Sequence, residues 1–211
     1  MAASSPHVPV ADAQPRPGLR ERKKIKTRVA IRTATYRLIS EQGYDATTVE
    51  QIAEAAEVSP STVFRYFPTK EDIVLTDEYD PYIEAELRSR PADEPLLESF
   101  KAVMADALRR SLAHEREETL LRTRLMVEVP AVRARVTEGL AATGRLLCGV
   151  VAERTGRQAD DLEVRVFAMG VTSALVETTL YWAERGQRED LVELIERTLD
   201  ALSTGFTLWR P

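Results

Sequence analysis

The spacing of apolar residues is the feature that most constrains how this chain can fold. From Leu19 onward they recur at intervals of three and four residues, the period of one face of an α-helix. No stretch alternates apolar and polar residues for long enough to form a β-strand. The sequence therefore predicts an all-α fold of about nine helices.

Prolines, glycines and capping residues set the expected helix boundaries. Thr48 and Gln51 have the spacing of a capping box, and Ser59 precedes a proline that suits a first helical position. The expected helices span residues 19–42, 49–56, 60–67, 70–88, 95–113, 117–128, 130–155, 160–185 and 189–209. Two short helices after a longer one are typical of a helix-turn-helix. We expect a disordered, proline-rich arm over residues 1–18, a helix-turn-helix domain over 19–75 and a second helical domain over 76–211.

Charge is distributed unevenly along the chain. The 211 residues have a net charge of −5, yet residues 1–75 hold 11 basic and 9 acidic side chains. Between Arg16 and Arg37, nine basic residues face a single acid, Glu21. This asymmetry indicates a two-part protein in which one part meets a polyanion, or else a helix with a solvated basic face.

Composition argues against export and membrane insertion. The longest uninterrupted apolar run, Leu146–Ala152, has seven residues, far fewer than the roughly 20 of a membrane span. The N-terminus lacks the apolar core of a secretory signal, and the single Cys148 cannot form an internal disulfide. We therefore expect a cytoplasmic protein with no membrane partner.

The sequence also lacks the motifs of common enzymes. One histidine, His7, lies in the predicted arm, and the other, His114, lies in His-Glu-Arg-Glu-Glu, which differs from the metal-binding HExxH pattern. Neither a glycine-rich phosphate loop nor a GxSxG elbow is present. We expect no enzyme activity, no metal and no cofactor.

The expected helix 60–67 carries side chains suited to binding DNA. An α-helix fits the major groove, and residues near its N-terminus reach base edges in helix-turn-helix proteins. Hydroxyls of Ser59, Ser61 and Thr62 gather at that end. Arg65 and Tyr66 follow them and can bond to phosphates or bases.

This segment resembles the TetR/AcrR family of bacterial transcriptional regulators. The residues that carry the resemblance are Thr47, Thr48, Val49, Ile52, Ala53, Ala56, Val58, Ser59 and the run Thr62-Val-Phe-Arg-Tyr-Phe-Pro-Thr-Lys-Glu-Asp-Ile73. The match covers about a quarter of the chain. It implies a homodimer that binds a near-palindromic operator in double-stranded DNA and a small hydrophobic effector that releases the repressor.

The resemblance also implies roles for single residues. Thr48 would contact a phosphate, and Tyr66 and Lys70 would hold the DNA backbone. Ser59, Ser61, Thr62 and Arg65 would lie on the recognition helix. A low-specificity architectural DNA-binding protein and a regulator without an effector are the alternatives.

Three positions depart from the family pattern. Glu57 stands where glycine is usual, which implies a cost of about 1 kcal/mol or a different turn. Phe64 stands where tyrosine is common, and Pro60-Ser61 replaces a frequent Lys-Gly. The operator sequence therefore cannot be taken over from the family.

The basic residues of the first helix, Arg22 and Lys26 among them, have two interpretations. They extend along the DNA or into a minor groove, or they form a solvated face that raises non-specific affinity.

In the body, the last two helices are strongly apolar and resemble the four-helix bundle through which the family dimerises, with an ordinary core as the alternative. The interface candidates are Leu175, Leu191, Ile195, Leu202 and Phe206. The ligand-binding candidates are Phe100, Met104, Leu125, Met126, Cys148, Phe167, Glu177 and Tyr181. Glu177 lies in an otherwise apolar helix, so it predicts a cationic or hydroxylated ligand or an arginine across the dimer interface.

Overall fold

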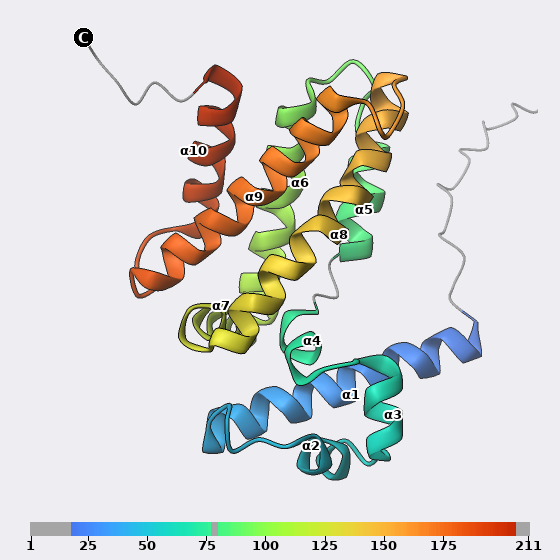
Figure 1. The fold of residues 1–211 in the computed structure, drawn as a ribbon, viewed down its shortest axis with the longest axis vertical. Coiled ribbons are helices and arrows are strands. Elements are labelled where there is room, and N and C mark those ends of the chain that lie inside the picture. The colour runs from blue at the N-terminus through green and yellow to red at the C-terminus, as the bar shows by residue number, and fades with distance from the viewer. Residues whose placement is uncertain (1–17, 77–79, 206–211) are drawn as a thin grey trace, which may run out of the picture.

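The structure of the chain is a computed structural model that describes residues 18–76 and 80–205. These residues form ten α-helices and no strand, which confirms the predicted all-α fold. The helices are α1 (Leu19–Gln42), α2 (Val49–Ala55), α3 (Pro60–Tyr66), α4 (Lys70–Leu75), α5 (Asp80–Ser89), α6 (Leu96–His114), α7 (Arg116–Glu128), α8 (Pro130–Thr155), α9 (Leu162–Glu184) and α10 (Leu191–Thr204). We call α1–α4 the head and α5–α10 the body (Figure 1). Phe206 and residues 1–17 of the expected arm lie outside the described residues.

Two expected boundaries are wrong. The segment 70–88 forms two helices, α4 and α5, because Thr76 leaves α4 with extended backbone and Pro81 lies in the first turn of α5. Proline has no N–H to donate, so it fits a first turn but not the interior of one continuous helix. The last helix ends at Thr204 rather than at residue 209, and Gly205 follows it with a φ of 73°.

The head packs around a small core of its own. Its buried apolar residues come from all four helices and are Ile31, Ile52, Ala53, Val63, Phe67 and Ile73. α2 lies on the side of α1 away from the body, α3 runs beside α2 and across the direction of α1, and α4 lies between α1 and the body (Figure 1). This arrangement leaves the outer faces of α2 and α3 open to a partner.

The N-terminal turns of α1 project past α3 (Figure 1). Ile25 and Val29, which the period predicts on the buried face of this helix, are exposed, whereas Ile31, Tyr36 and Ile39 are buried. The prediction is wrong for the first turns because no other helix of the described head lies beside them.

The body packs α6, α8, α9 and α10 around a larger core that includes Phe100, Cys148 and Trp182. α8 and α9 lie side by side and approach closely at Gly144 (Figure 1). A Cβ atom there would lie 2.2 Å from the Sδ of Met169. The missing side chain thus makes room for Met169 between the two helices.

The apolar stripe of α10 packs inside its own protomer, against α6 and α9. Leu191 and Ile195 are each only 3% exposed, so the expectation that they face a second copy is wrong. Leu175 and Leu202 are partly buried against the same core. The apolar face of an amphipathic helix is buried against one apolar surface. For α10 that surface is provided by α6 and α9 of the same chain.

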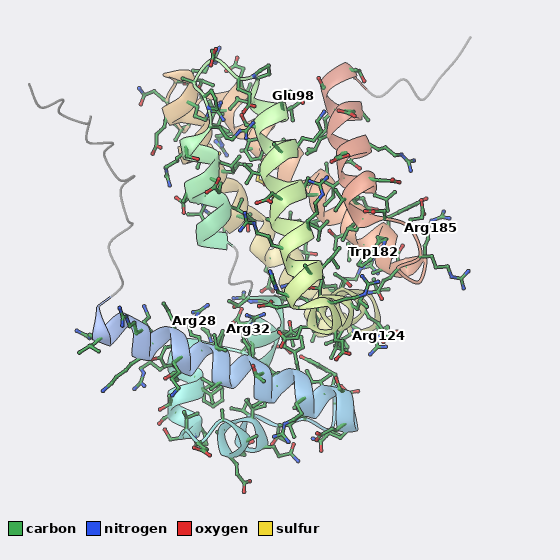
Figure 2. All side chains as sticks on the ribbon, turned by 180° about the vertical axis from the view of Figure 1, so that it is seen from behind. Arg28, Arg32, Glu98, Arg124, Trp182 and Arg185 are labelled. Carbon is green, nitrogen blue, oxygen red and sulfur yellow. The ribbon has the colours of Figure 1, made fainter. Side chains whose placement is uncertain are left out.

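The head joins the body through buried contacts of α1 and α4. The phenol of Tyr36 donates to the carbonyl oxygen of Val74 at 2.7 Å, and burial raises the pKa of this phenol. Arg32 extends from α1 towards the body (Figure 2), where its Nη2 lies 3.7 Å from Glu115 and 3.5 Å from Glu118. Burial also raises the pKa of Glu118, although Arg32 opposes this effect.

Candidate DNA-binding interface and ligand cavity

The start of α2 is fixed by the predicted capping box. The Oγ1 of Thr48 accepts from the backbone N–H of Gln51, and the side chain of Gln51 accepts from the backbone N–H of Thr48 at 2.9 Å. Gln42 of α1 donates to the same Gln51 side chain at 2.9 Å. Thr48 is exposed at this corner, so its hydroxyl can donate a hydrogen bond to a phosphate while its backbone N–H stays in the capping box.

The turn between α2 and α3 takes the conformation that glycine usually provides. Glu57 has a φ of 55°, in the left-handed region that non-glycine residues rarely adopt. Of the two alternatives that the sequence left open, the structure has the left-handed backbone and not a different turn, and the strain costs about 1 kcal/mol. The backbone N–H of Val58 still donates to the carbonyl of Ala53, so the turn keeps its closing hydrogen bond.

Three hydroxyls meet at the N-terminal end of α3. Ser59 is the N-cap and accepts from the backbone N–H of Thr62 at 3.2 Å, and Pro60 occupies the first helical position, as predicted. The Oγ of Ser59 lies 2.9 Å from the hydroxyls of both Ser61 and Thr62. Ser59 and Ser61 are exposed and Thr62 is half-buried, so this end of the helix presents polar hydrogen-bonding groups outward.

Further along α3, the exposed face carries Phe64 and Arg65. The Arg65 guanidinium carbon lies 5.5 Å from the ring centre of Tyr66, which is itself half-buried against the core of the head. Phe64 is 50% exposed although it is aromatic. Sequence reasoning treated Phe64 only as a lost tyrosine hydroxyl. Its exposure could have been predicted from the sequence. Val63 points to the inner side of the helix, so its neighbours Phe64 and Arg65 fall on the outer side.

Lys70 lies under the loop that precedes α2. Its Nζ donates to the carbonyl oxygens of Tyr44 at 2.8 Å and Thr47 at 3.0 Å, and it sits 3.9 Å from the ring centre of Tyr44. Two of its three N–H donors are therefore used within the head. The structure makes Lys70 a residue that positions the loop carrying Thr48.

Tyr44 also ties this loop to α4. Its phenol donates to the Glu71 carboxylate at 2.6 Å. Burial, and then this hydrogen bond, raise the pKa of the phenol. Burial opposes ionisation of Glu71 as well, but hydrogen bonds from Tyr44, the backbone and Thr69 outweigh it and lower the pKa of the carboxyl.

The basic side of α1 is solvent-exposed near its N-terminus. Arg22 and Lys26 are both exposed and lie four residues apart, on the same side of the helix. Arg28 lies further along, where its guanidinium stacks 5.0 Å from the ring centre of Phe67 at the end of α3. This contact joins the basic segment of α1 to the recognition helix.

A cavity of about 450 Å³ lies in the body and reaches the head. Its lining comes from α4 and from all six helices of the body. Apolar side chains dominate, and they are joined by seven hydroxyls, two arginines and one carboxylate. The volume falls within the range of about 300–1,000 Å³ that is usual for small-molecule sites.

Only part of the predicted ligand set lines this cavity. Met104 and Met126 do. The others lie elsewhere: Phe100, Leu125 and Cys148 are buried in the core, Phe167 is half-buried beside Phe100, and Glu177 and Tyr181 are exposed. Glu177 is therefore not a carboxylate enclosed by apolar residues, because the helix that carries it is not buried on every side.

Five exposed apolar side chains of the body belong to α8 and α9. They are Leu146, Leu162, Val166, Met169 and Tyr181, and we call them the α8–α9 patch. Leu146, Leu162 and Val166 are 66%, 71% and 63% exposed, unusual values for aliphatic residues. Sequence reasoning placed the dimer face on α9 and α10 instead.

In the part of the chain that the structure describes, no helix combines the length and apolarity needed to cross a membrane. The same residues contain no group of three or more His, Cys, Asp or Glu that could hold a metal ion.

Comparisons with known proteins agree along almost the whole chain. Residues 31–76 match the family model for bacterial regulatory proteins of the tetR family, and residues 94–207 match the model for the MftR C-terminal domain. The chain is 33% identical over 205 residues to the HTH-type transcriptional regulator TcmR of Streptomyces glaucescens, an alignment covering 92% of this chain and 91% of TcmR.

Two solved structures of FadR share the fold. The Thermus thermophilus protein, a TetR-family repressor in complex with lauroyl-CoA, matches with a TM-score of 0.54 and 25% identity over 87% of this chain and 97% of its own. The Bacillus subtilis regulator in complex with stearoyl-CoA matches with the same TM-score and identity over 84% and 98%.

Proposed function

Because this chain belongs to the TetR family of bacterial transcriptional regulators, we propose that it represses transcription from a near-palindromic operator and leaves the DNA when a small molecule fills the cavity of the body. The observation that carries this proposal is the exposed end of α3. The hydroxyl of Ser59 caps this end of the helix. The hydrogen bond from the backbone N–H of Val58 to the carbonyl of Ala53 fixes the turn before it.

Within the proposal, each exposed group of the head has a task. Ser61 and Arg65 reach base edges in the major groove, because they lie on the outer face of α3 and can donate hydrogen bonds to purine acceptors. Phe64 packs on the methyl group of a thymine. Thr48 binds a phosphate, while Lys70 acts indirectly by holding the loop that carries Thr48.

The basic turns of α1 supply phosphate contacts beyond the recognition helix. Arg22 and Lys26 are exposed on a segment that projects past α3, which suits a helix that follows the DNA backbone. Neutralising each phosphate steepens the salt dependence of binding by about one unit of slope. The double variant Arg22→Gln/Lys26→Gln should therefore lower that slope by about two while preserving sequence preference.

We place the dimer interface on the α8–α9 patch. It holds five exposed apolar side chains that a second copy would cover, and a two-fold axis through it would make the same residues face each other in both copies. Val166→Glu should convert the dimer to a monomer in light scattering and reduce operator affinity. Ile25→Glu, which adds the same charge at an exposed apolar site on α1, should leave the oligomeric state unchanged.

The experiment that tests the function is selection of genomic fragments bound by the purified protein, followed by footprinting. A regulator should prefer one operator over random DNA by at least about a thousandfold. Arg65→Ala should cost about 1–3 kcal/mol of binding and relax the preference at one position in each half-site. Equal affinity for all fragments would favour the architectural alternative and exclude a specific regulator.

A further inference from the structure

The charged side chains of the cavity are few and of mixed sign. Among the residues that line it, Arg122 and Arg135 are basic and Asp72 is acidic. Asp72 belongs to α4 of the head, whereas both arginines belong to the body. The wall of the cavity near Arg135 is therefore shared between head and body. A ligand in this cavity therefore meets two guanidinium groups, one of which is paired with a carboxylate of the head.

Arg135 holds Asp72 through a direct ion pair. Its Nε donates to the Oδ1 of Asp72 at 2.7 Å, and its Nη1 donates to Glu138 at 3.0 Å on the outer side. The side chain of Asp72 is 16% exposed and that of Arg135 is 39% exposed, so the pair is accessible from the cavity but not deeply desolvated. An exposed pair of this kind contributes little free energy, and a second acid can replace its carboxylate.

The rest of the wall favours an apolar ligand body. Eleven lining residues are apolar, among them Met104, Leu108 and Val176. Several hydroxyls of the wall already donate to carbonyls one turn earlier in their own chain. These hydroxyls belong to Thr76, Thr123, Thr172 and Thr179. Because these O–H groups already donate to backbone carbonyls, they have no hydrogen left for an acceptor on the ligand. A hydrocarbon chain, which offers no acceptor, therefore fits this part of the wall.

We propose that the cavity binds an amphipathic anion, whose acidic group takes the place of Asp72 on Arg135 and whose apolar chain extends among α6, α7 and α9. The inference rests on the proposed function, because it names the chemical class of the effector. Exchange of one carboxylate for another keeps a charge-assisted hydrogen bond to the guanidinium. An anionic ligand differs from the cationic or hydroxylated ligand expected from Glu177, which is exposed and does not line the cavity.

The same exchange reaches the DNA-binding loop. The second oxygen of Asp72, Oδ2, accepts from the backbone N–H of Thr69 at 3.1 Å and from its hydroxyl at 2.9 Å, which fixes the start of α4. Lys70, the next residue, bonds to the carbonyl of Thr47 beside Thr48. Release of Asp72 from Arg135 thus frees the N-terminal turn of α4 from α8 and changes the position of a proposed phosphate contact.

The inference is tested with four probes that share a twelve-carbon chain. Dodecanoate, dodecyltrimethylammonium and dodecanol are titrated into the full-length protein below their micelle-forming concentrations, with binding followed by calorimetry and by the unfolding temperature. Dodecanoate should bind and raise the unfolding temperature more than the cation or the alcohol. Lauroyl-CoA, the fourth probe, distinguishes a free carboxylate from the phosphates of a thioester as the source of the anion.

Variants on the two sides of the ion pair then assign the site. Arg135→Gln and Arg122→Gln should each weaken dodecanoate binding about tenfold or more. Arg124→Gln is the matched control, because Arg124 lies on the exposed side of α7 and pairs with Glu128 at 3.8 Å (Figure 2). Asp72→Asn should strengthen dodecanoate binding about two- to fivefold, since the competing carboxylate is gone.

The results separate this inference from the proposed function. Equal binding of the cation and the anion, or equal losses in Arg135→Gln and Arg124→Gln, would overturn the inference while operator binding stood. Failure to bind any operator would overturn the proposed function, and the dodecanoate result would still decide the chemistry of the cavity. If dodecanoate releases operator from the natural protein but not from Asp72→Asn, the route through Asp72 is supported.

Discussion

The side chains that we propose to read base edges lie on one seven-residue helix of the head, whereas the cavity takes its lining from seven helices that are far apart in the sequence. The head fixes its site with hydrogen bonds between residues three apart, such as Ser59 with Thr62. The body has no such local device around Arg135, which meets Asp72 across 63 positions. A DNA-binding surface can thus be encoded locally, but a ligand site depends on how distant helices pack.

The largest expected effect comes from deleting one aromatic ring in each region. Phe67 is 1% exposed in the head core and Phe100 is 2% exposed in the body core, so alanine should cost about 3–5 kcal/mol at either site. Phe67→Ala should abolish operator binding but leave dodecanoate binding intact, as the head core is small. Phe100→Ala should weaken dodecanoate binding, and it should weaken operator binding as well, because the body carries the proposed dimer interface. Circular dichroism and fluorescence anisotropy with operator DNA measure both, and identical losses in the two variants would show that head and body do not fold as distinguishable units.

A smaller loss is expected where the two regions meet. Tyr36→Phe removes the donor to the Val74 carbonyl, and a buried acceptor left without its partner costs about 1–3 kcal/mol. The free energy of unfolding in urea measures this loss. Tyr181→Phe removes a hydroxyl from a partly exposed ring and should change stability by less than about 0.5 kcal/mol. Equal effects at both sites would mean that the junction contributes nothing beyond ordinary surface contacts.

A gain of stability is expected in the turn of the head. Glu57→Gly should stabilise the head by about 1 kcal/mol, because glycine adopts a φ of 55° without a clash of its Cβ. Glu57→Gln keeps the backbone strain and removes only the charge, so it serves as the control. Thermal unfolding should separate the two variants. If glutamine stabilises as much as glycine, the charge and not the backbone conformation accounts for the gain.

The smallest effect concerns pH at the junction. Burial raises the pKa of Glu118 in the folded protein above its unfolded value, so the native state binds more protons than the unfolded state just above the ordinary pKa. Stability from this group is therefore present at low pH and is lost as the pH rises through the raised pKa. Relative to Glu118→Gln, the natural protein should lose less than about 1 kcal/mol between pH 4 and pH 7, because Glu118 is partly exposed and near Arg32. Urea unfolding across that range measures the difference, and a relative gain of stability with rising pH would contradict the assignment.

Predictions from sequence succeeded where the physical cause is local. The capping box of Thr48 and the cap at Ser59 each depend on residues within a few positions, and both are confirmed. Family membership followed from the same short segment. Predictions were wrong where a stripe could pack on more than one partner. Leu191 looks equally suited to a dimer and to a core, and only its neighbours on α6 and α9 decide between them.

By itself, the sequence determined the all-helical fold, the helix-turn-helix and the polar end of α3, because helix period, caps and turns are set by residues close together in the chain. Only the tertiary structure decided that Glu177 faces outward, that Arg135 meets Asp72 in a cavity wall, and that the large apolar residues left exposed in the described part of the body lie on α8 and α9. The physical reason is that burial and ion pairing depend on which helices pack against each other. The sequence of a helix determines where its apolar face lies, but it does not determine which other helix covers that face.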